Sequence, residues 1–263
     1  LAAALDSGAF DYVVIAVETV EHLAILNELA IRGHRGAVLV EKPLFAAPAP
    51  LPRHNFSTAG TGYNLRFHAA VQALHAELGG RHAEAATLYV GQWLGDWRPG
   101  RDVTATYSAS RAAGGGALRD LSHELDLATW LFGPWQRVAA LGGRLGNVTV
   151  DADDAWSILL TCARCPMVSL QINYFDQPAR RDITVQMAGQ TLVTDLIANS
   201  RSCDGKKESF ATERDFSYLA MHQALLQGSR EVAGLEDGLA TVELIAAIEQ
   251  AAREGRWIER KAA

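Results

Sequence analysis

The sequence has no long apolar run and no excess of positive charge. None of its 263 residues belongs to a run of 18 or more consecutive apolar residues, the length that a membrane-spanning helix needs. The formal net charge is −6 at pH 7, from 24 Lys and Arg against 30 Asp and Glu. A nucleic-acid-binding surface needs a basic patch, which this balance disfavours. We therefore expect neither a membrane nor a nucleic acid among the partners.

Cysteine is also scarce. The three cysteines, Cys162, Cys165 and Cys203, are too few and too unevenly spaced for a secreted disulfide framework, which favours a reducing, cytoplasmic location. The stretch "CARC" has no second cysteine pair, so a four-ligand zinc site is not expected. It falls between two expected strands rather than at a helix N-terminus, where a thiol would be activated. We interpret this pair as incidental and predict no metal site.

The rest of the composition is typical of a folded globular protein. The chain is 49% hydrophobic and 21% charged, and it is long enough for one large or two medium domains. Residues 11–17 ("DYVVIAV") and 37–43 ("AVLVEKP") contain short apolar runs typical of buried parallel strands. Residues 18–33 between them have the apolar spacing of a helix that ends at Gly33. The sequence therefore predicts a strand–helix–strand unit.

After this unit the pattern changes. Residues 45–61 are rich in Pro, Ala and Gly, and we interpret them as a linker. Helices are expected at 64–80, 213–227 and 236–254, and strands at 84–94, 136–145, 154–162, 166–175, 181–188 and 189–196. These elements predict part of an α/β domain of nucleotide-binding type over residues 1–60. An α+β domain with an open sheet is expected over residues 61–263.

A lysine follows the second expected strand. Glu41, Lys42 and Pro43 lie at its carboxyl end, which is where ligands bind to parallel sheets. Pro43 has a fixed φ and holds the preceding residue extended, so Lys42 projects in a defined direction. A lysine so placed can hold a hydroxyl or carbonyl oxygen, or lose a proton when it is desolvated. The alternative is a solvated lysine at the end of a strand.

The stretch "GGGALRDLSHELDLATWLFG" at residues 114–133 places three glycines ahead of an expected helix. If residues 118–132 form one helix, Asp120, His123 and Glu124 share one face near its N-terminus. A histidine there can exchange protons near neutral pH, and a neighbouring carboxylate would raise its pKa. The glycines would let a ligand approach the backbone. The alternative is a satisfied interior histidine, an acid that favours the helix dipole and a plain glycine loop.

The stretch "GQWLGDWRPGRD" ends in an expected loop that carries Trp97, Arg98 and Arg101. An aromatic face beside guanidinium groups suits stacking on a sugar or base and binding of phosphate or carboxylate. The alternative is a core or interface tryptophan with solvated arginines.

Together these stretches resemble the Gfo/Idh/MocA family, the relatives of glucose–fructose oxidoreductase and inositol dehydrogenase. The likeness runs over nearly the whole chain, through "LVEKPL", "GYNLRFHAAV", the glycine–acid–histidine stretch and "EDGLATVELIAAIEQAAREGRWI". The specific signal is E-K-P followed about 70 residues later by a Gly-rich loop and D-x-x-H-x-x-D. "VGQWLGDWRPGRD" beside "DLSHELD" is most similar to the branch associated with sugars of bacterial surface polysaccharides.

The resemblance implies a Rossmann-type domain that holds NAD or NADP, followed by a domain with an open, largely antiparallel sheet. It implies a dehydrogenase or reductase that acts on CH–OH groups and transfers a hydride to or from a carbon of a sugar or nucleotide-sugar. The family's catalytic lysine falls on Lys42, and its helix acid and histidine fall on Asp120 and His123. His123 would carry the proton, Lys42 would orient and polarise the reacting oxygen, and Asp120 would orient or share the proton.

The resemblance also implies two further sets of residues. The nicotinamide pocket would be lined by Glu18, Thr19, His22, Glu41, Lys42, Pro43 and Asn64. The substrate would be faced by Trp97, Arg98, Arg101 and Glu124. Many members of the family space the acid and the histidine by four residues, whereas Asp120 and His123 are three apart, so the acid is either Asp120 or Glu124. The open sheet is expected to pack against a second copy of the chain.

The family's Gly-rich G-x-G-x-x-G turn and its first strands do not occur in this sequence, which starts at Leu1. We therefore expect a truncation within the nucleotide-binding domain. Two alternatives to the oxidoreductase stay open: a glycosidase that uses NAD through transient oxidation, and a non-catalytic ligand-sensing protein on the same fold.

Overall fold

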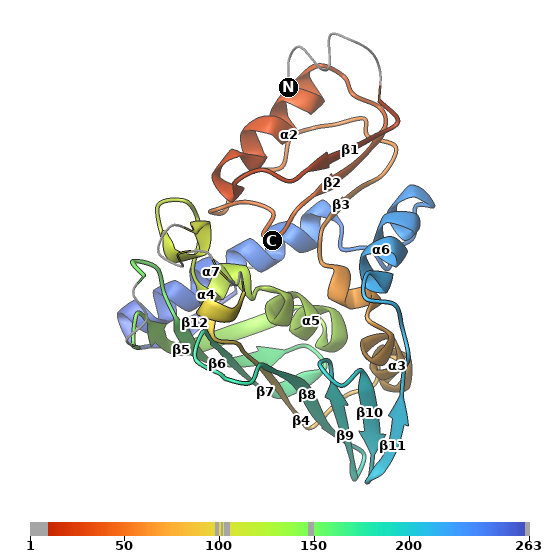
Figure 1. The fold of residues 1–263 in the computed structure, drawn as a ribbon, viewed down its shortest axis with the longest axis vertical. Coiled ribbons are helices and arrows are strands. Elements are labelled where there is room, and N and C mark those ends of the chain that lie inside the picture. The colour runs from red at the N-terminus through yellow and green to blue at the C-terminus, as the bar shows by residue number, and fades with distance from the viewer. Residues whose placement is uncertain (1–9, 98–99, 101, 103–105, 147–149, 261–263) are drawn as a thin grey trace.

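The computed structural model describes residues 10–97, 100, 102, 106–146 and 150–260, which form two sheets with helices between them (Figure 1). The smaller sheet has three parallel strands, β1 (Tyr12–Ile15), β2 (Ala37–Val40) and β3 (Ala59–Thr61), in the order β1-β2-β3. The 3₁₀ helix η1 (Thr19–Glu21) and α2 (His22–Ile31) connect β1 to β2. The expected strand–helix–strand unit is therefore present.

The expected linker at residues 45–61 is wrong at its end. Ala59–Thr61 pairs in parallel with β2 and extends the smaller sheet, because Gly60 allows an approach that a side chain would block. A β carbon at Gly60 would lie 2.7 Å from Cγ1 of Val232. A Gly-rich segment can therefore be a strand where another element packs closely against it.

The larger sheet has nine strands in the order β11-β10-β9-β8-β4-β7-β6-β5-β12. All neighbouring strands are antiparallel except β4 and β7, so the expected open, largely antiparallel sheet is confirmed. The strands are β4 (Ala85–Gly91), β5 (Trp135–Gly143), β6 (Ala155–Cys162), β7 (Cys165–Asn173), β8 (Arg180–Met187), β9 (Gln190–Asp195), β10 (Ser200–Cys203), β11 (Lys206–Ser209) and β12 (Ile258–Glu259).

Helices cover one face of this larger sheet. In Figure 1, α3, α4, α5 and α7 lie between the two sheets, and no helix of the described residues covers the opposite face. The helical segments are η2 (Asn64–Phe67), α3 (Ala69–Leu78), η3 (Leu94–Asp96), η5 (Tyr107–Ala109), α4 (Ala117–Asp120), α5 (His123–Phe132), α6 (Phe216–Leu226) and α7 (Leu235–Glu254).

The helix expected over residues 118–132 is two helices, with a break at Leu121 and Ser122 between α4 and α5. In a continuous helix the main-chain oxygen of Asp120 would accept the N–H of Glu124. Here the Glu124 N–H donates to Leu121 O at 3.4 Å, and the oxygen of Asp120 accepts Nζ of Lys42 instead. The break therefore frees a carbonyl that a distant lysine uses.

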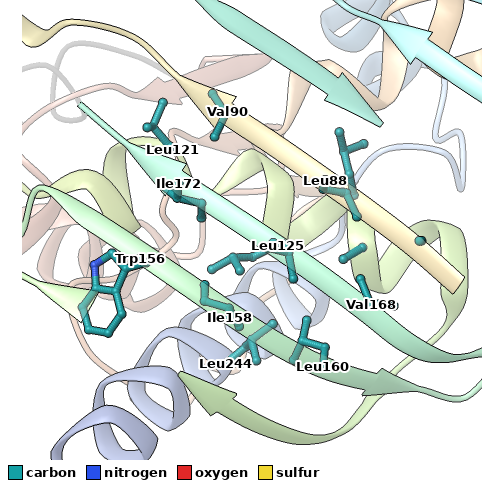
Figure 2. Close-up of a cluster of buried hydrophobic side chains, with 14 of the residues drawn as sticks. Leu88, Val90, Leu121, Leu125, Trp156, Ile158, Leu160, Val168, Ile172 and Leu244 are labelled. Carbon is teal, nitrogen blue, oxygen red and sulfur yellow. The ribbon is translucent and has the colours of Figure 1, made fainter. Parts of the chain in front are cut away.

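The main core fills the space between the larger sheet and the helices above it. Leu125 of α5 and Leu244 of α7, both fully buried, face the sheet. Figure 2 shows the strand residues that meet them, Leu88, Val90, Ile158, Leu160, Val168 and Ile172. Other residues of β5, β6 and β7, among them Leu141, Leu159 and Met167, are exposed.

Helix α7 belongs to the cores of both sheets. Leu235 and Val242 pack with the smaller sheet, whereas Leu244 and Ile248 pack with the larger one. The helix can approach β3 because position 238 is glycine: a β carbon there would lie 2.2 Å from Oγ1 of Thr61. In the part of the chain that the structure describes, no helix is long and apolar enough to cross a bilayer.

A buried arginine connects three of the helical segments. Arg66 of η2 donates from Nε and Nη2 to the two carboxylate oxygens of Asp126 in α5, at 2.9 and 2.6 Å. Its Nη1 donates to Asp237 of α7 at 3.1 Å. Arg66 and Asp126 are 3% and 1% exposed, so each charge depends on the other for solvation.

We predict that Arg66→Ala lowers the free energy of unfolding by about 3–5 kcal/mol, because it leaves Asp126 buried without a counter-charge. Urea denaturation measures this change. The matched control is Arg81→Ala: Arg81 forms an exposed i,i+4 pair with Glu77 and donates to the main-chain oxygens of Glu77 and Leu78. Its loss leaves no buried charge without a partner and should cost less than about 1 kcal/mol. Equal effects of the two substitutions would contradict the structural role given to Arg66.

Candidate active site

The loops that follow β1, β2 and β3 meet at the carboxyl edge of the smaller sheet. His22 holds the first two of these loops together: Nε2 contacts Val17 O, and Nδ1 contacts the carbonyl oxygens of Pro43 and Leu44, all at 3.2 Å. His22 is 1% exposed. Its nitrogens serve the main chain, so the expectation that His22 lines the nicotinamide pocket does not agree with the structure.

Lys42 leaves this edge and reaches α4. Its Nζ donates a hydrogen bond to the main-chain oxygen of Asp120 at 2.5 Å. Burial lowers the pKa of Lys42, and the carboxylates of Asp120 and Glu41 oppose that change. The expected pair Lys42 and Asp120 is therefore in contact, but through the backbone of Asp120 and not through its carboxylate.

The carboxylate of Asp120 is occupied by two tyrosines. Oδ2 accepts the hydroxyl of Tyr174 at 2.6 Å, and Oδ1 accepts the hydroxyl of Tyr107. Burial and the adjacent Asp120 raise the pKa of Tyr174 well above its ordinary value, so Tyr174 stays a donor. Asp120 itself is 3% exposed. The expectation that its carboxylate orients His123 is wrong, because the helix break turns it away.

His123 is the first residue of α5 and is 9% exposed. Its Nδ1 is buried and has no hydrogen-bond partner among the described residues. The ring lies edge-on to Tyr63, with centroids 5.5 Å apart. Burial, followed by the positive charges of Lys42 and Arg181, holds the pKa of His123 well below its ordinary value. The expected upward shift of this pKa is wrong, and His123 is a neutral base near pH 7.

Glu124 does not pair with His123. It is 2% exposed, and its two carboxylate oxygens accept Nε and Nη2 of Arg181 at 2.6 and 2.9 Å. Glu124 is also not among the residues that line the pocket beside His123. The expectation that Glu124 faces the substrate or replaces Asp120 as the acid does not agree with this arrangement.

His123 lies in the wall of a pocket of about 420 Å³. Asn64 lines it as well and is held by a hydrogen bond of 2.8 Å from its Nδ2 to Oγ of Ser217. The lining residues are Asn64, Leu65, His68, Ala69, His123, Arg181, Leu196, Ile197, Asn199, Thr212, Glu213, Arg214, Phe216, Ser217 and Tyr218. Most of them are polar, and they come from five separate segments of the chain, which suits a polar ligand.

The Gly-rich loop ahead of α4 lies against the loop after β1. A β carbon at Gly114 would be 3.5 Å from Cβ of Thr19, so the two segments lie close together with no side chain of the glycine between them. Thr19 is buried and Glu18 is exposed. Beside β2, Oε2 of Glu41 accepts the Lys42 N–H at 3.3 Å, and Pro43 is buried. These four residues therefore lie at the carboxyl edge of the smaller sheet, and their contact with a nicotinamide stays a prediction.

The expected substrate loop is only partly described. Trp97 packs edge-on against Tyr174, with ring centroids 5.4 Å apart, and it is partly buried against the main core. Arg98 and Arg101 lie outside the described residues. Trp97 thus supports the tyrosine that holds Asp120.

Sequence reasoning missed Tyr63, Tyr107, Tyr174 and Arg181. Tyr63 lies in the stretch "GYNLRFHAAV" but was not singled out there, and the nearest signal for Tyr174 and Arg181 is that they lie at the ends of expected strands. No group of three or more His, Cys, Asp or Glu residues that could hold a metal ion occurs in the described ranges.

Part of the chain matches a known protein family. Residues 84–192 match the family model described as GFO/IDH/MocA C-terminal domain. A comparison with curated protein sequences finds no match.

Several solved structures share the fold. GenD2 from gentamicin A biosynthesis, in complex with NAD, has a TM-score of 0.80 and 21% identity over 100% of this chain and 82% of that one. The WlbA dehydrogenase from Bordetella pertussis, in complex with NADH and UDP-GlcNAcA, has a TM-score of 0.80 and 20% identity over 100% and 83%. Levoglucosan dehydrogenase, in complex with NADH and levoglucosan, has a TM-score of 0.81 and 16% identity over 97% and 81%.

We predict that His123 makes the protein less stable in acid. Its folded pKa lies below the ordinary value of about 6.5, so between these values the unfolded chain binds a proton that the folded chain does not. Stability therefore falls as the pH drops below about 6.5, and His123→Gln should reduce that fall. Unfolding free energies at pH 7 and pH 5 measure the effect, with the exposed His82→Gln as the control. An identical pH dependence in wild type and His123→Gln would refute the assignment.

Proposed function

We propose that this chain, whose residues 84–192 match the family model described as GFO/IDH/MocA C-terminal domain, is an NAD- or NADP-dependent oxidoreductase acting on a CH–OH group of a sugar or nucleotide-sugar. The observation that carries this proposal is the hydrogen bond from Lys42 to Asp120 O. It joins the carboxyl edge of a parallel sheet to the short helix that precedes His123. An amine and a neutral imidazole therefore lie at the edge where dinucleotides bind in such folds.

The residues at this edge fit a nicotinamide cofactor. The buried Nδ1 of His123 has no partner among the described residues, and the loop at Gly114 leaves no side chain between itself and Thr19. Glu18, Thr19, Glu41, Pro43 and Asn64 would hold the cofactor, with His22 fixing the loops behind it. When bound, the cofactor supplies the oxidising or reducing equivalents for the sugar carbon.

Two side chains handle the reacting oxygen and its proton. Lys42 donates one of its three N–H bonds to Asp120 and has two left for the oxygen of the substrate. Oxidation of an alcohol to a carbonyl releases the hydroxyl proton, and His123 accepts it because the ring is neutral. Asp120 is a positioning residue: its main-chain oxygen orients Lys42, and Tyr107 and Tyr174 hold its carboxylate.

The known structures with this fold support the cofactor and the substrate class. All three of those complexes contain NAD or NADH, and two of them also contain a sugar or nucleotide-sugar. The chain's polar pocket beside His123 suits a ligand of that kind. The two alternatives make different predictions: a glycosidase would release an aglycone without net NADH, and a sensor would bind without turnover.

The first test combines NADH binding with turnover. We expect the protein to quench or shift NADH fluorescence on titration and to reduce NAD with at least one member of a panel of neutral sugars, sugar acids and nucleotide-sugars. Lys42→Met should lower turnover by about 10²–10⁴-fold, because the reacting oxygen loses its donor, while NADH still binds.

Lys207→Met, an exposed lysine on β11, is the matched control and should keep wild-type turnover. Failure of the wild type to bind NADH or NADPH would overturn the proposal. NADH binding without turnover on any sugar would favour the ligand-sensing alternative. Wild-type turnover by Lys42→Met would remove Lys42 from the mechanism.

A further inference from the structure

Arg181 lies in the wall of the His123 pocket, at the start of β8. Its side chain is 21% exposed, whereas that of its partner Glu124 is 2% exposed. The arginine is therefore the member of the pair that a ligand can touch, and the carboxylate is the buried one.

The pair joins β8 to the first turn of α5. Glu124 directly follows His123, and its carboxylate binds Nε and Nη2 of Arg181 in a two-pronged contact at 2.6 and 2.9 Å. Such a contact fixes the plane of the guanidinium group as well as its position. A guanidinium group has five N–H bonds, and Glu124 takes two of them, so three are left on the side away from the carboxylate.

We propose that Arg181, anchored by Glu124, is a positioning residue for His123 and a contact for an oxygen of the substrate. The first part stands on the geometry of the pair. The second part rests on the proposed function, because it requires that the pocket binds a sugar. The role that sequence reasoning gave to Glu124 thereby passes to its partner.

Charge gives Arg181 a measurable effect on His123. The two cations that act on the imidazole are Arg181 and Lys42, and both oppose its protonation. The titratable or charged groups around the pocket come from several elements. They are Lys42 after β2, Tyr63 and His68 on either side of η2, Arg181 of β8, Glu213 and Arg214 ahead of α6, and Tyr218 of α6. Removal of Arg181 should therefore make His123 easier to protonate.

The test follows the His123 ring by NMR titration of the whole protein. In Arg181→Gln the pH midpoint of the His123 titration should rise, because one of the two cations that oppose protonation is lost. Arg181→Lys keeps the cation and should leave the midpoint close to that of the wild type. Arg180→Gln is the matched control: Arg180 is the preceding residue on β8, its side chain is exposed, and it pairs with Asp182.

An unchanged His123 midpoint in Arg181→Gln would overturn the positioning role. If this variant does not fold, the double variant Arg181→Gln with Glu124→Gln removes both buried charges, and its midpoint should lie above that of Glu124→Gln alone. Unfolding midpoints should also be non-additive, with the double variant less affected than the sum of the two single variants.

Steady-state kinetics test the substrate contact. With a sugar that wild type oxidises, Arg181→Gln should raise KM by about 10-fold or more, and Arg181→Lys should recover part of the loss. An unchanged KM would leave Arg181 without a substrate role. The NMR experiment needs neither cofactor nor substrate. If the His123 midpoint rises in Arg181→Gln but the protein does not bind NADH, only the proposed function is contradicted. If the protein binds NADH but the His123 midpoint is the same in Arg181→Gln and in the wild type, only the role of Arg181 is contradicted.

Discussion

The other elements of the structure rely on the tight packing of α7 against β3. There is no room for a β carbon at Gly238, so the backbone of the helix packs directly against the side chain of Thr61 in β3. The same helix contributes apolar side chains to both sheets and supplies Asp237 to the buried Arg66. Since Arg66 also binds Asp126 of α5, the helix that begins at His123 is fixed relative to the sheet that presents Lys42.

The acidic residues next to His123 in the sequence do not bind its ring. Both carboxylates that the sequence places near this histidine are buried and bound elsewhere, Asp120 by two tyrosines and Glu124 by Arg181. The groups that act on the imidazole are instead cations, Lys42 and Arg181. A base that must stay uncharged at neutral pH is well served by this arrangement, because burial and like charge act in the same direction.

Local pattern was a good guide to the strands and to the residues at the sheet edge. Strands β4 to β9 lie within the predicted ranges or extend one residue beyond them, since each alternates between a buried and an exposed face. The hairpin of β10 and β11 was missed because its residues, "SRSC" and "KKES", carry no apolar alternation. The break after Asp120 was missed for another reason: Lys42, which binds the carbonyl oxygen that the break leaves free, lies 78 residues away in the chain. Long-range contacts of this kind leave no local trace, and the same holds for the pairing of Arg181 with Glu124.

The single parallel pairing in the larger sheet has a consequence for the order in which the sheet forms. β4 is the first strand of that sheet in the chain, yet its two neighbours are β7 and β8, with Ala86 opposite Val168 and Val185. It cannot pair until those later strands are available, whereas β5, β6 and β7 can form as consecutive hairpins. Contacts between such distant segments form slowly because a long loop must close first. During synthesis, therefore, the central strand of the finished sheet is the one that waits longest for a partner, with both of its edges open to other chains.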